Sequence, residues 1–314
     1  MIPAPSILIA TWGDGLFNVS GSTVQQELAD QSVRSLVADG RGGVLAILSG
    51  HSLGRRSSDG EWTMIAESEI ELSCCIPIGS AVVVGTEDAR ILRVDPNGAQ
   101  RWMTGFEAVP GRDCWYAGAA IVDGKLMGPP LGVRSLAVTC DGAALLANVH
   151  VGGIPRSTDS GVTWRPTVDI DNDVHQVCAH STRPEIAIAA AAVGLCISRD
   201  AGKTWTVEQN GLHAHYCSAV AFGRNRIFVA ASTDHFATHG SIYRRPIDSN
   251  GPLQPLGGMP KWLDGIADTN CIATHEAIVA VIDRSGRLYL SHDDGDTWAD
   301  PVDRLPVPSG LCIQ

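Results

Sequence analysis

The chain has 314 residues, of which 44% are hydrophobic, 5% aromatic and 18% charged. This apolar fraction is large enough for a packed core, which excludes an intrinsically disordered chain. The formal net charge of −11 repels phosphate backbones and anionic lipids, so we expect neither a nucleic-acid partner nor a membrane partner.

The amino-terminal sequence MIPAPSILIATWGDG has no basic segment and runs directly into a predicted strand, so we expect no signal peptide. The nine cysteines are an odd number, and most stand singly within apolar stretches instead of at the spacings of a disulfide framework. A reducing cytoplasm is the location that these features favour.

Short apolar segments recur along the chain and are predicted to open successive repeats. They begin at Val33, Leu72, Val133, Val174, His215 and Thr269, and read VRSLVAD, LSCCIPI, VRSLAVT, VHQVCAH, HYCSAVA and TNCIATH. The spacing is 41 residues from Val133 to Val174 and again from Val174 to His215. A four-stranded propeller blade takes roughly 40 to 45 residues. We therefore predict an all-β chain in which residues 1–314 form one domain, a seven-bladed β-propeller.

Two segments depart from this period. Residues 106–131, FEAVPGRDCWYAGAAIVDGKLMGPPL, are predicted to be an insertion between the third and fourth blades. Residues 233–240, TDHFATHG, form a long predicted loop within the sixth blade. Long loops on a rigid scaffold often carry function.

One octapeptide, S-x-D-x-G-x-T-W, occurs three times, as STDSGVTW at 157–164, SRDAGKTW at 198–205 and SHDDGDTW at 291–298. An Asp carboxylate in a turn accepts hydrogen bonds from backbone amides, Gly adopts positive φ, and Ser and Thr hydroxyls tie the two strands together. We therefore predict hairpin turns in which Asp159, Asp200 and Asp293 have a structural role.

The octapeptide resembles the Asp-box, or BNR, repeat of the sialidase-like β-propellers, and weaker copies such as RSSDGEW at 56–62 extend the resemblance over most of the chain. The resemblance implies that the Asp boxes lie on outer hairpins, on the face opposite the usual binding mouth. It also implies that a catalytic sialidase would have an early Arg-Ile-Pro segment. The corresponding region IATWGDGLF lacks one, so we do not expect a sialidase.

The two ends of the chain are predicted to pair. Residues 7–21, ILIATWGDGLFNVSG, match a blade that starts at its second strand, and residues 309–314, SGLCIQ, match the missing first strand. A carboxy-terminal strand that completes the first blade would remove the exposed sheet edges.

Loops at one end of the axis are expected to form a binding mouth. The residues that we predict to bind a ligand there are Trp12, Arg34, His51, Glu87, Arg134, Tyr216, Asp234 and Asn270. Guanidinium groups grip carboxylates and phosphates through paired hydrogen bonds, so Arg34 and Arg134 suit a small polar or anionic molecule. The concave mouth of a propeller is the expected site for such a ligand.

Three histidines of this mouth, His150, His175 and His215, come from adjacent predicted blades. Three imidazoles with one open position would bind a divalent metal and lower the pKa of a bound water. We therefore predict that these residues are catalytic, as metal ligands or as acid and base groups. No H-x-x-x-H or H-E-x-x-H spacing in the sequence supports the metal.

Three function classes remain open. The first, which we prefer, is an intracellular small-molecule enzyme that uses the His- and Arg-lined mouth. The second is a non-catalytic scaffold for protein partners, like the photosystem assembly factors that carry similar repeats. The third is a glycoside hydrolase or lectin, which the missing export signal disfavours.

Overall fold

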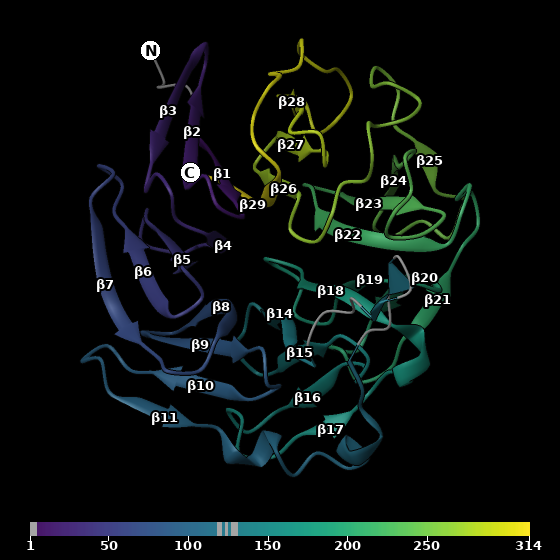
Figure 1. Cartoon of the computed structure of the whole chain (residues 1–314). Coiled ribbons are helices and arrows are strands. Elements are labelled where there is room, and N and C mark those ends of the chain that lie inside the picture. Colours follow the sequence, from purple (N-terminus) through teal and green to yellow (C-terminus); the bar gives the residue numbers. More distant parts are fainter. Residues whose placement is uncertain (1–4, 118–120, 123–124, 127–130) are drawn as a thin grey trace.

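Antiparallel sheets follow one another around a central axis and form a ring of seven blades (Figure 1). The computed structural model describes residues 5–117, 121–122, 125–126 and 131–314. Within these residues six blades have four strands and one has three. In the seventh blade an isolated bridge between Val302 and Leu288 occupies the place of the outermost strand. The predicted fold class, an all-β seven-bladed propeller, is confirmed.

The blades use the following strands, each given from the axis outwards. Blade 1 has β29 (Pro308–Ile313), β1 (Ile7–Thr11), β2 (Leu16–Ser20) and β3 (Thr23–Glu27). Blade 2 has β4 (Val33–Ala38), β5 (Val44–Leu48), β6 (Ser52–Arg56) and β7 (Trp62–Glu67). Blade 3 has β8 (Leu72–Ile78), β9 (Ala81–Thr86), β10 (Ile91–Val94) and β11 (Gln100–Trp102). Blade 4 has β14 (Val133–Val138), β15 (Leu145–Val149), β16 (Pro155–Ser157) and β17 (Arg165–Pro166).

The remaining blades follow the same order. Blade 5 has β18 (Val174–Ala179), β19 (Ala187–Ala191), β20 (Gly194–Ser198) and β21 (Thr206–Glu208). Blade 6 has β22 (Tyr216–Phe222), β23 (Arg226–Ser232), β24 (Ser241–Pro246) and β25 (Gln254–Pro255). Blade 7 has β26 (Ile272–His275), β27 (Ile278–Ile282) and β28 (Leu288–Ser291).

The ring closes through both its inner strands and its chain ends. Each first strand contacts the first strand of the next blade, and β26 contacts β29 to complete the circle. Strand β29 pairs antiparallel with β1, with Ile7 opposite Ile313 and Ile9 opposite Leu311. The backbone amide of Gln314 donates to the Ser6 carbonyl at 2.8 Å. The carboxy-terminal strand thus completes the first blade, as predicted.

Hydrogen bonds from side chains join neighbouring inner strands. Ser35 Oγ accepts from the Cys75 amide at 2.8 Å, and Ser135 Oγ accepts from the Val177 amide at 2.9 Å. Ser218 Oγ donates to the Ala267 carbonyl at 2.6 Å. Because these backbone groups are buried near the axis, each of them needs a partner there. The inner strands are thereby held in register from blade to blade.

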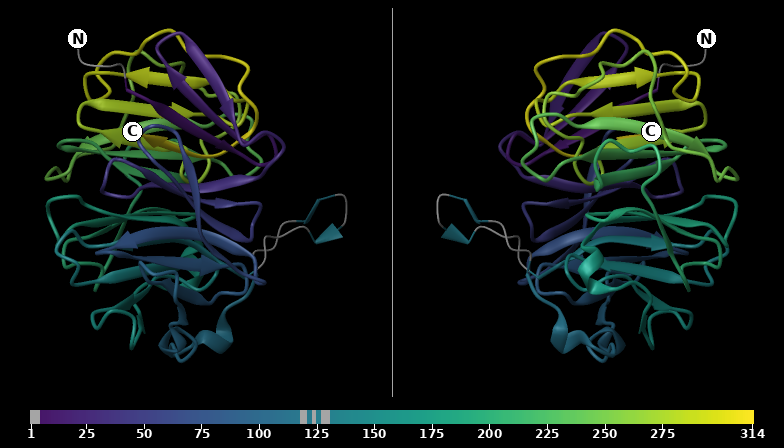
Figure 2. Two further views of the ribbon diagram at one scale, coloured as in Figure 1. Left: turned by 90° about the vertical axis from the view of Figure 1, so that its left-hand side faces the viewer. Right: turned by 90° about the vertical axis from the view of Figure 1, so that its right-hand side faces the viewer.

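Between blades 3 and 4 the chain forms η1 (Thr104–Phe106) and η2 (Arg112–Cys114), and then the short hairpin of β12 (Ile121–Val122) and β13 (Lys125–Leu126). This hairpin stands away from the rest of the ring in Figure 2. The predicted insertion at 106–131 falls here, although its residues 118–120, 123–124 and 127–130 lie outside the described residues. Another single turn, η3 (Ile170–Asn172), precedes β18. None of the helices in the described residues could span a membrane.

The three octapeptides form the predicted turns. Asp159 Oδ1 accepts from the Thr163 amide at 2.8 Å, and its Oδ2 accepts from the Thr163 hydroxyl at 2.6 Å. Ser157 Oγ accepts from the Gly161 amide at 2.8 Å, and Gly161 has φ of 86°. The second and third copies repeat these bonds around Asp200 and Asp293. The carboxylates are therefore occupied within their own turns.

Two of these turns are expected to make stability depend on pH. Hydrogen bonds from the Thr163 hydroxyl and amide lower the pKa of Asp159 to about 2, and Thr297 does the same for Asp293. Because the folded pKa lies below the unfolded value of about 3.9, this stability is present above that value and is lost as the pH falls through about 2. The melting temperature of Asp159→Asn/Asp293→Asn should therefore fall less between pH 4 and pH 2 than that of the wild type.

Thermal unfolding followed by circular dichroism from pH 2 to pH 7 measures this difference. The exposed Asp113 of η2 accepts no side-chain hydrogen bond within the described chain, so Asp113→Asn should follow the wild-type profile. Parallel profiles for the double variant and the wild type would contradict the assigned role of the turns.

Candidate functional site

Contacts between side chains run from blade to blade around one end of the axis. They link the loops between second and third strands with the first residues of the inner strands and the segments just before them. The members are Trp12, Arg34, Glu71, Glu87, Arg134, His150, Asp173, His175, Tyr216, His235, Asp268 and Arg284. We call this set the axial mouth.

β-Bulges at the start of the inner strands aim several of these side chains. In β18 the ladder pairs Val174 with Ala191 and then Gln176 with Ala190, which leaves His175 as the extra residue. The same slip leaves Arg134 extra in β14. A bulged residue is released from the pleat and its side chain is redirected, which is why bulges recur beside functional sites.

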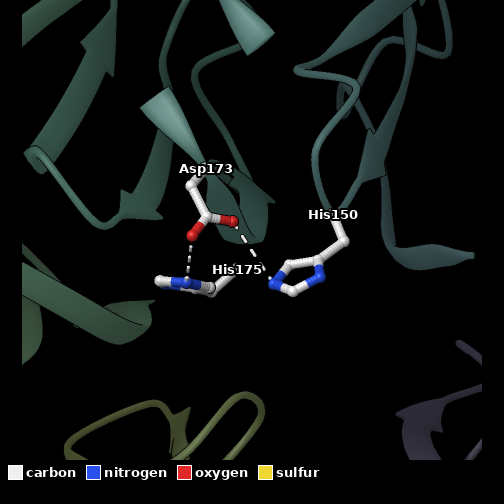
Figure 3. A group of neighbouring side chains, drawn as sticks. All are labelled: His150, Asp173 and His175. Atoms are coloured by element: carbon white, nitrogen blue, oxygen red, sulfur yellow. Dashed lines mark ion pairs between the residues drawn. The ribbon is translucent and has the colours of Figure 1, made fainter. Parts of the chain in front are cut away.

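The cluster of His150, Asp173 and His175 is the most concentrated chemical feature of the axial mouth (Figure 3). His150 Nε2 lies 3.3 Å from Asp173 Oδ1, and His175 Nε2 lies 3.8 Å from Asp173 Oδ2. One ligand atom from each residue lies within 4.8 Å of the other two. We call these three residues the triad.

The hydrogen-bond partner of His175 fixes the tautomer of its ring. Nδ1 lies 2.6 Å from the Cys217 carbonyl oxygen, which can only accept, so Nδ1 carries the proton. The Nε2 atom is buried, has no hydrogen-bond partner and faces Asp173. Asp173 Oδ1 and His150 Nδ1 are also buried and make no hydrogen bond, although His150 Nε2 lies 3.3 Å from Asp173 Oδ1. Such groups are rare in folded proteins, and each one calls for an explanation.

His150 is neutral at physiological pH. Burial lowers its pKa to about 4, although the nearby Asp173 carboxylate acts in the opposite direction. The Asp173 backbone has φ of 48°, in the left-handed region that non-glycine residues seldom adopt. Such backbone strain concentrates at functional sites. Here it turns the carboxylate toward the two imidazoles directly after η3.

Tyr216 packs against this cluster from blade 6. Its ring centroid lies 4.5 Å from that of His175, with the two planes tilted by 42°. Burial raises the pKa of Tyr216, and the carboxylates of Asp268 and Asp173 add to the effect. The phenol is therefore neutral and is available as a hydrogen-bond donor.

The arginines of the axial mouth are paired with acids. Arg34 contacts Glu71 at 2.5 Å and Glu87 at 2.9 Å, and Arg134 lies 3.6 Å from Glu87. Arg284 contacts Asp268 at 3.1 Å. Across the axial mouth the carboxylates outnumber the guanidinium groups. The net charge of these groups therefore favours binding of a cation. From Arg34 and Arg134 alone we had expected an anion.

A hollow of about 280 Å³ opens in the axial mouth beside these pairs. It is lined by Trp12, His235, Asp268, Arg284, Val307 and Pro308. Trp12 is 56% exposed, which is unusual for so large an apolar side chain. Arg284 donates to the His235 carbonyl at 2.8 Å and lies 3.2 Å from His235 Nε2. One wall of the hollow is thus apolar and the other carries donors and acceptors. We call it the axial hollow.

A second hollow of about 370 Å³ lies at the long loop predicted in the sixth blade. It is lined by His213, Thr233, Ala237, Thr238, His239 and Trp262. His213 Nδ1 lies 2.8 Å from the Tyr243 hydroxyl. These histidines have ring contacts with Trp262 and are not members of the triad.

The other predicted site residues fall outside the triad. His215 is exposed and takes no part in it. His51 is also exposed, and its Nδ1 lies 3.1 Å from the Ser68 carbonyl oxygen. Asp234 accepts from the Phe236 amide at 2.7 Å. The Asn270 amide donates to Gln176 Oε1 at 3.1 Å.

Three acids of the axial mouth, Glu71, Asp173 and Asp268, were not among the predicted residues. Each stands two positions before the equivalent position of its inner strand, which is occupied by Ser73, His175 and Asn270 respectively. The recurrence of an acid at this position in three repeats is a sequence signal that would have found them.

Comparisons with known proteins give the fold. No protein-family model and no curated protein matches the chain. The GH74 enzyme of Niastella koreensis has a TM-score of 0.59 at 13% identity, over 93% of this chain and 46% of that one. An ancestral GH74 enzyme has a TM-score of 0.61 at 11% identity, over 98% and 40% of the two chains. The computationally designed Ika8 protein has a TM-score of 0.54 at 12% identity, over 90% of each chain.

This chain therefore spans less than half the length of the two GH74 enzymes. At such identities the likeness establishes the propeller fold alone, because one fold hosts many unrelated functions.

Proposed function

We propose that this protein is an enzyme that binds a small polar molecule in its axial mouth. The observation that carries the proposal is the triad, in which buried polar atoms that make no hydrogen bond lie close together in the axial mouth. Buried polar groups without partners are costly. Nitrogen and oxygen atoms held in this way are poised to meet a ligand.

The surroundings support a small and polar ligand. Trp12 offers an exposed aromatic face, and Arg284 and Asp268 offer a donor and an acceptor on the opposite wall of the axial hollow. His150 is neutral and can accept a hydrogen bond, and Tyr216 is neutral and can donate one. These two groups can therefore orient a polar ligand by hydrogen bonds.

We also propose that the protein is related to the Asp-box propellers and that it is located in the cytoplasm. The octapeptide turns around Asp159, Asp200 and Asp293 support kinship with the Asp-box propellers of the sialidase-like superfamily. All nine cysteines are free, which supports a reducing cytoplasm. Hydrolysis of a glycoside is less well supported, because it needs two available carboxyl groups across the bond. Of the carboxylates here, Glu87 is engaged by Arg34 and Arg134.

The test is a thermal-shift screen of the purified chain against small carboxylates, phosphates, sugars and nucleotides. A ligand at a hundred times its dissociation constant adds about 2.7 kcal/mol of stability. In a chain of this size that raises the melting temperature by roughly 5 °C. Trp12→Ala and Arg284→Ala should each lose most of that rise, because they remove opposite walls of the axial hollow.

Trp102→Ala is the matched control. Trp102 is 37% exposed and lies on the outer strand β11, so its loss should leave the shift unchanged. If no class of compound moves the melting temperature, or if Trp102→Ala abolishes the shift equally, the axial mouth is not a small-molecule site. The protein would then be better described as a non-catalytic scaffold for a protein partner.

A further inference from the structure

The strongest unexplained feature of the described chain is the arrangement of atoms around His175. Its side chain is only 7% exposed, and its Nε2 lies 3.8 Å from Asp173 Oδ2 without a hydrogen bond. In the neutral ring, whose proton is on Nδ1 because that atom donates to the Cys217 carbonyl, Nε2 directs its lone pair at the carboxylate, and this contact is repulsive. The arrangement is favourable when a positive charge lies between the two groups.

We propose that His150, Asp173 and His175 bind one divalent transition-metal ion. The proposal deepens that of an enzyme in the axial mouth, and it rests on that function only for the chemistry which the ion would support. The site takes Asp173 as its third ligand in place of His215, which is exposed and is not a member of the triad.

The donor set selects the class of ion. Magnesium and calcium prefer oxygen ligands alone, whereas imidazole nitrogens favour zinc, cobalt, nickel and iron. The triad offers two imidazole nitrogens and one carboxylate. Three protein ligands leave further positions open to water or substrate, which is the pattern of catalytic sites and not of structural ones.

The geometry suits a site that tightens around the ion. With bonds of about 2.0 to 2.2 Å, ligand atoms lie roughly 3 to 3.5 Å apart. The three donor atoms now lie within 4.8 Å of one another, so shifts of about 1 Å are needed. His150 lies on the turn after β15 and Asp173 on the connection after η3, where side chains can make such shifts. His175 in β18 provides the fixed point.

The hydrogen-bond partner of His175 is of the kind found behind metal-binding histidines. Metal-binding histidines nearly always donate their second ring N–H to a carbonyl or carboxylate, which sets the tautomer and the ring orientation. His175 does so through Nδ1 to Cys217. The excess of carboxylates in the axial mouth adds an electrostatic preference for a cation. An ion here would keep coordination positions that a water or a substrate oxygen could occupy, and it could polarise that oxygen.

The experiment uses the full chain after a chelator has removed any bound metal. The chain is titrated with Co²⁺ while visible absorption is recorded, and a second sample is titrated with Zn²⁺ in a calorimeter. We expect one equivalent to bind, with the absorption of a cobalt ion that has nitrogen and oxygen ligands. Asp173→Asn and His175→Ala should each weaken binding by about 100-fold or more. His150→Ala should do the same.

His215→Ala and His213→Ala are the controls, and both should bind within about two-fold of the wild type. Circular dichroism of the metal-free variants checks that each one is folded. Three results would overturn the proposal: no stoichiometric binding, equal binding by Asp173→Asn, or a thiolate-to-cobalt band that places the ion on Cys114 or Cys140, the exposed cysteines.

The readout requires no substrate. A chain that binds cobalt at the triad but no small molecule would therefore contradict the proposed enzyme and leave the metal site intact. A chain that binds small molecules but no metal would do the reverse.

Discussion

Removal of residues 308–314 should abolish cooperative folding of the ring. All six residues of β29 are buried, and β29 supplies the inner edge of blade 1 between β1 and β4. Burying a Leu or Ile side chain contributes about 1.5 to 3 kcal/mol, and the lost ladder adds to this. The sum approaches the 5 to 15 kcal/mol that holds a typical domain together. Circular dichroism and urea unfolding measure the outcome.

The same deletion exposes a strand edge that can be filled again. A synthetic peptide of residues 307–314, added to the truncated chain, should restore a single melting transition because it can pair with β1. Within the intact chain, Leu311→Ala should cost about 2 to 4 kcal/mol. Val24→Ala on β3, where the side chain is 46% exposed, should cost less than about 1 kcal/mol. A truncated chain that melts like the wild type would show that ring closure contributes little.

The second large effect is expected from Glu27→Gln. Glu27 ends β3 and accepts hydrogen bonds from Arg56 at 2.7 and 2.9 Å and from Trp62 Nε1 at 3.0 Å. Arg56 is only 5% exposed, so the substitution leaves a buried guanidinium without its carboxylate. Breaking such a pair costs about 3 kcal/mol. The melting temperature should fall by roughly 5 to 10 °C at neutral pH.

The pH dependence of this loss has a definite sign. Burial acts to raise the pKa of Glu27, but the bonds from Arg56 and Trp62 outweigh it and hold the pKa below its usual value. The stabilisation is therefore present above the unfolded pKa and is lost as the pH falls through the folded one. The difference between Glu27→Gln and the wild type should shrink in acid.

Glu185→Gln serves as the comparison for Glu27→Gln. Its partner Arg183 lies 3.0 Å away, but the Glu185 side chain is 46% exposed. A surface pair of this kind contributes less than about 1 kcal/mol. If both variants lose the same amount of melting temperature at pH 7, the buried pair between blades 1 and 2 stabilises the protein no more than a surface pair does.

Most of the fold could be predicted because it depends on local patterns. The spacing of Val133 and Val174, and the three octapeptides, report on single blades, and blades repeat. Closure by residues 309–314 followed from counting strands. The three-stranded seventh blade did not, because an outer strand is exposed and has little apolar pattern to reveal it.

The site was predicted less completely, for a geometrical reason. His150 and His175 were placed at the axial mouth from their positions in the repeats, and the structure brings them together. Whether His215 or Asp173 joins them depends on the local backbone. Asp173 turns inward through a positive φ, and His175 is redirected by a bulge. Neither the positive φ nor the bulge has a signature in a single sequence, although the acid that recurs two positions before the inner-strand position would have placed Asp173 at the axial mouth.

The bulges also bear on how this protein could change over time. Arg134 and His175 occupy the same unpaired place in blades 4 and 5, outside the ladder of backbone bonds, whereas Ser73 and Ser218 use that place to hydrogen-bond the next blade. A mutation at such a place alters the chemistry offered to a ligand without disturbing the pairing of the sheet. The ring can therefore acquire new specificities one blade at a time, while the architecture that carries them is inherited unchanged.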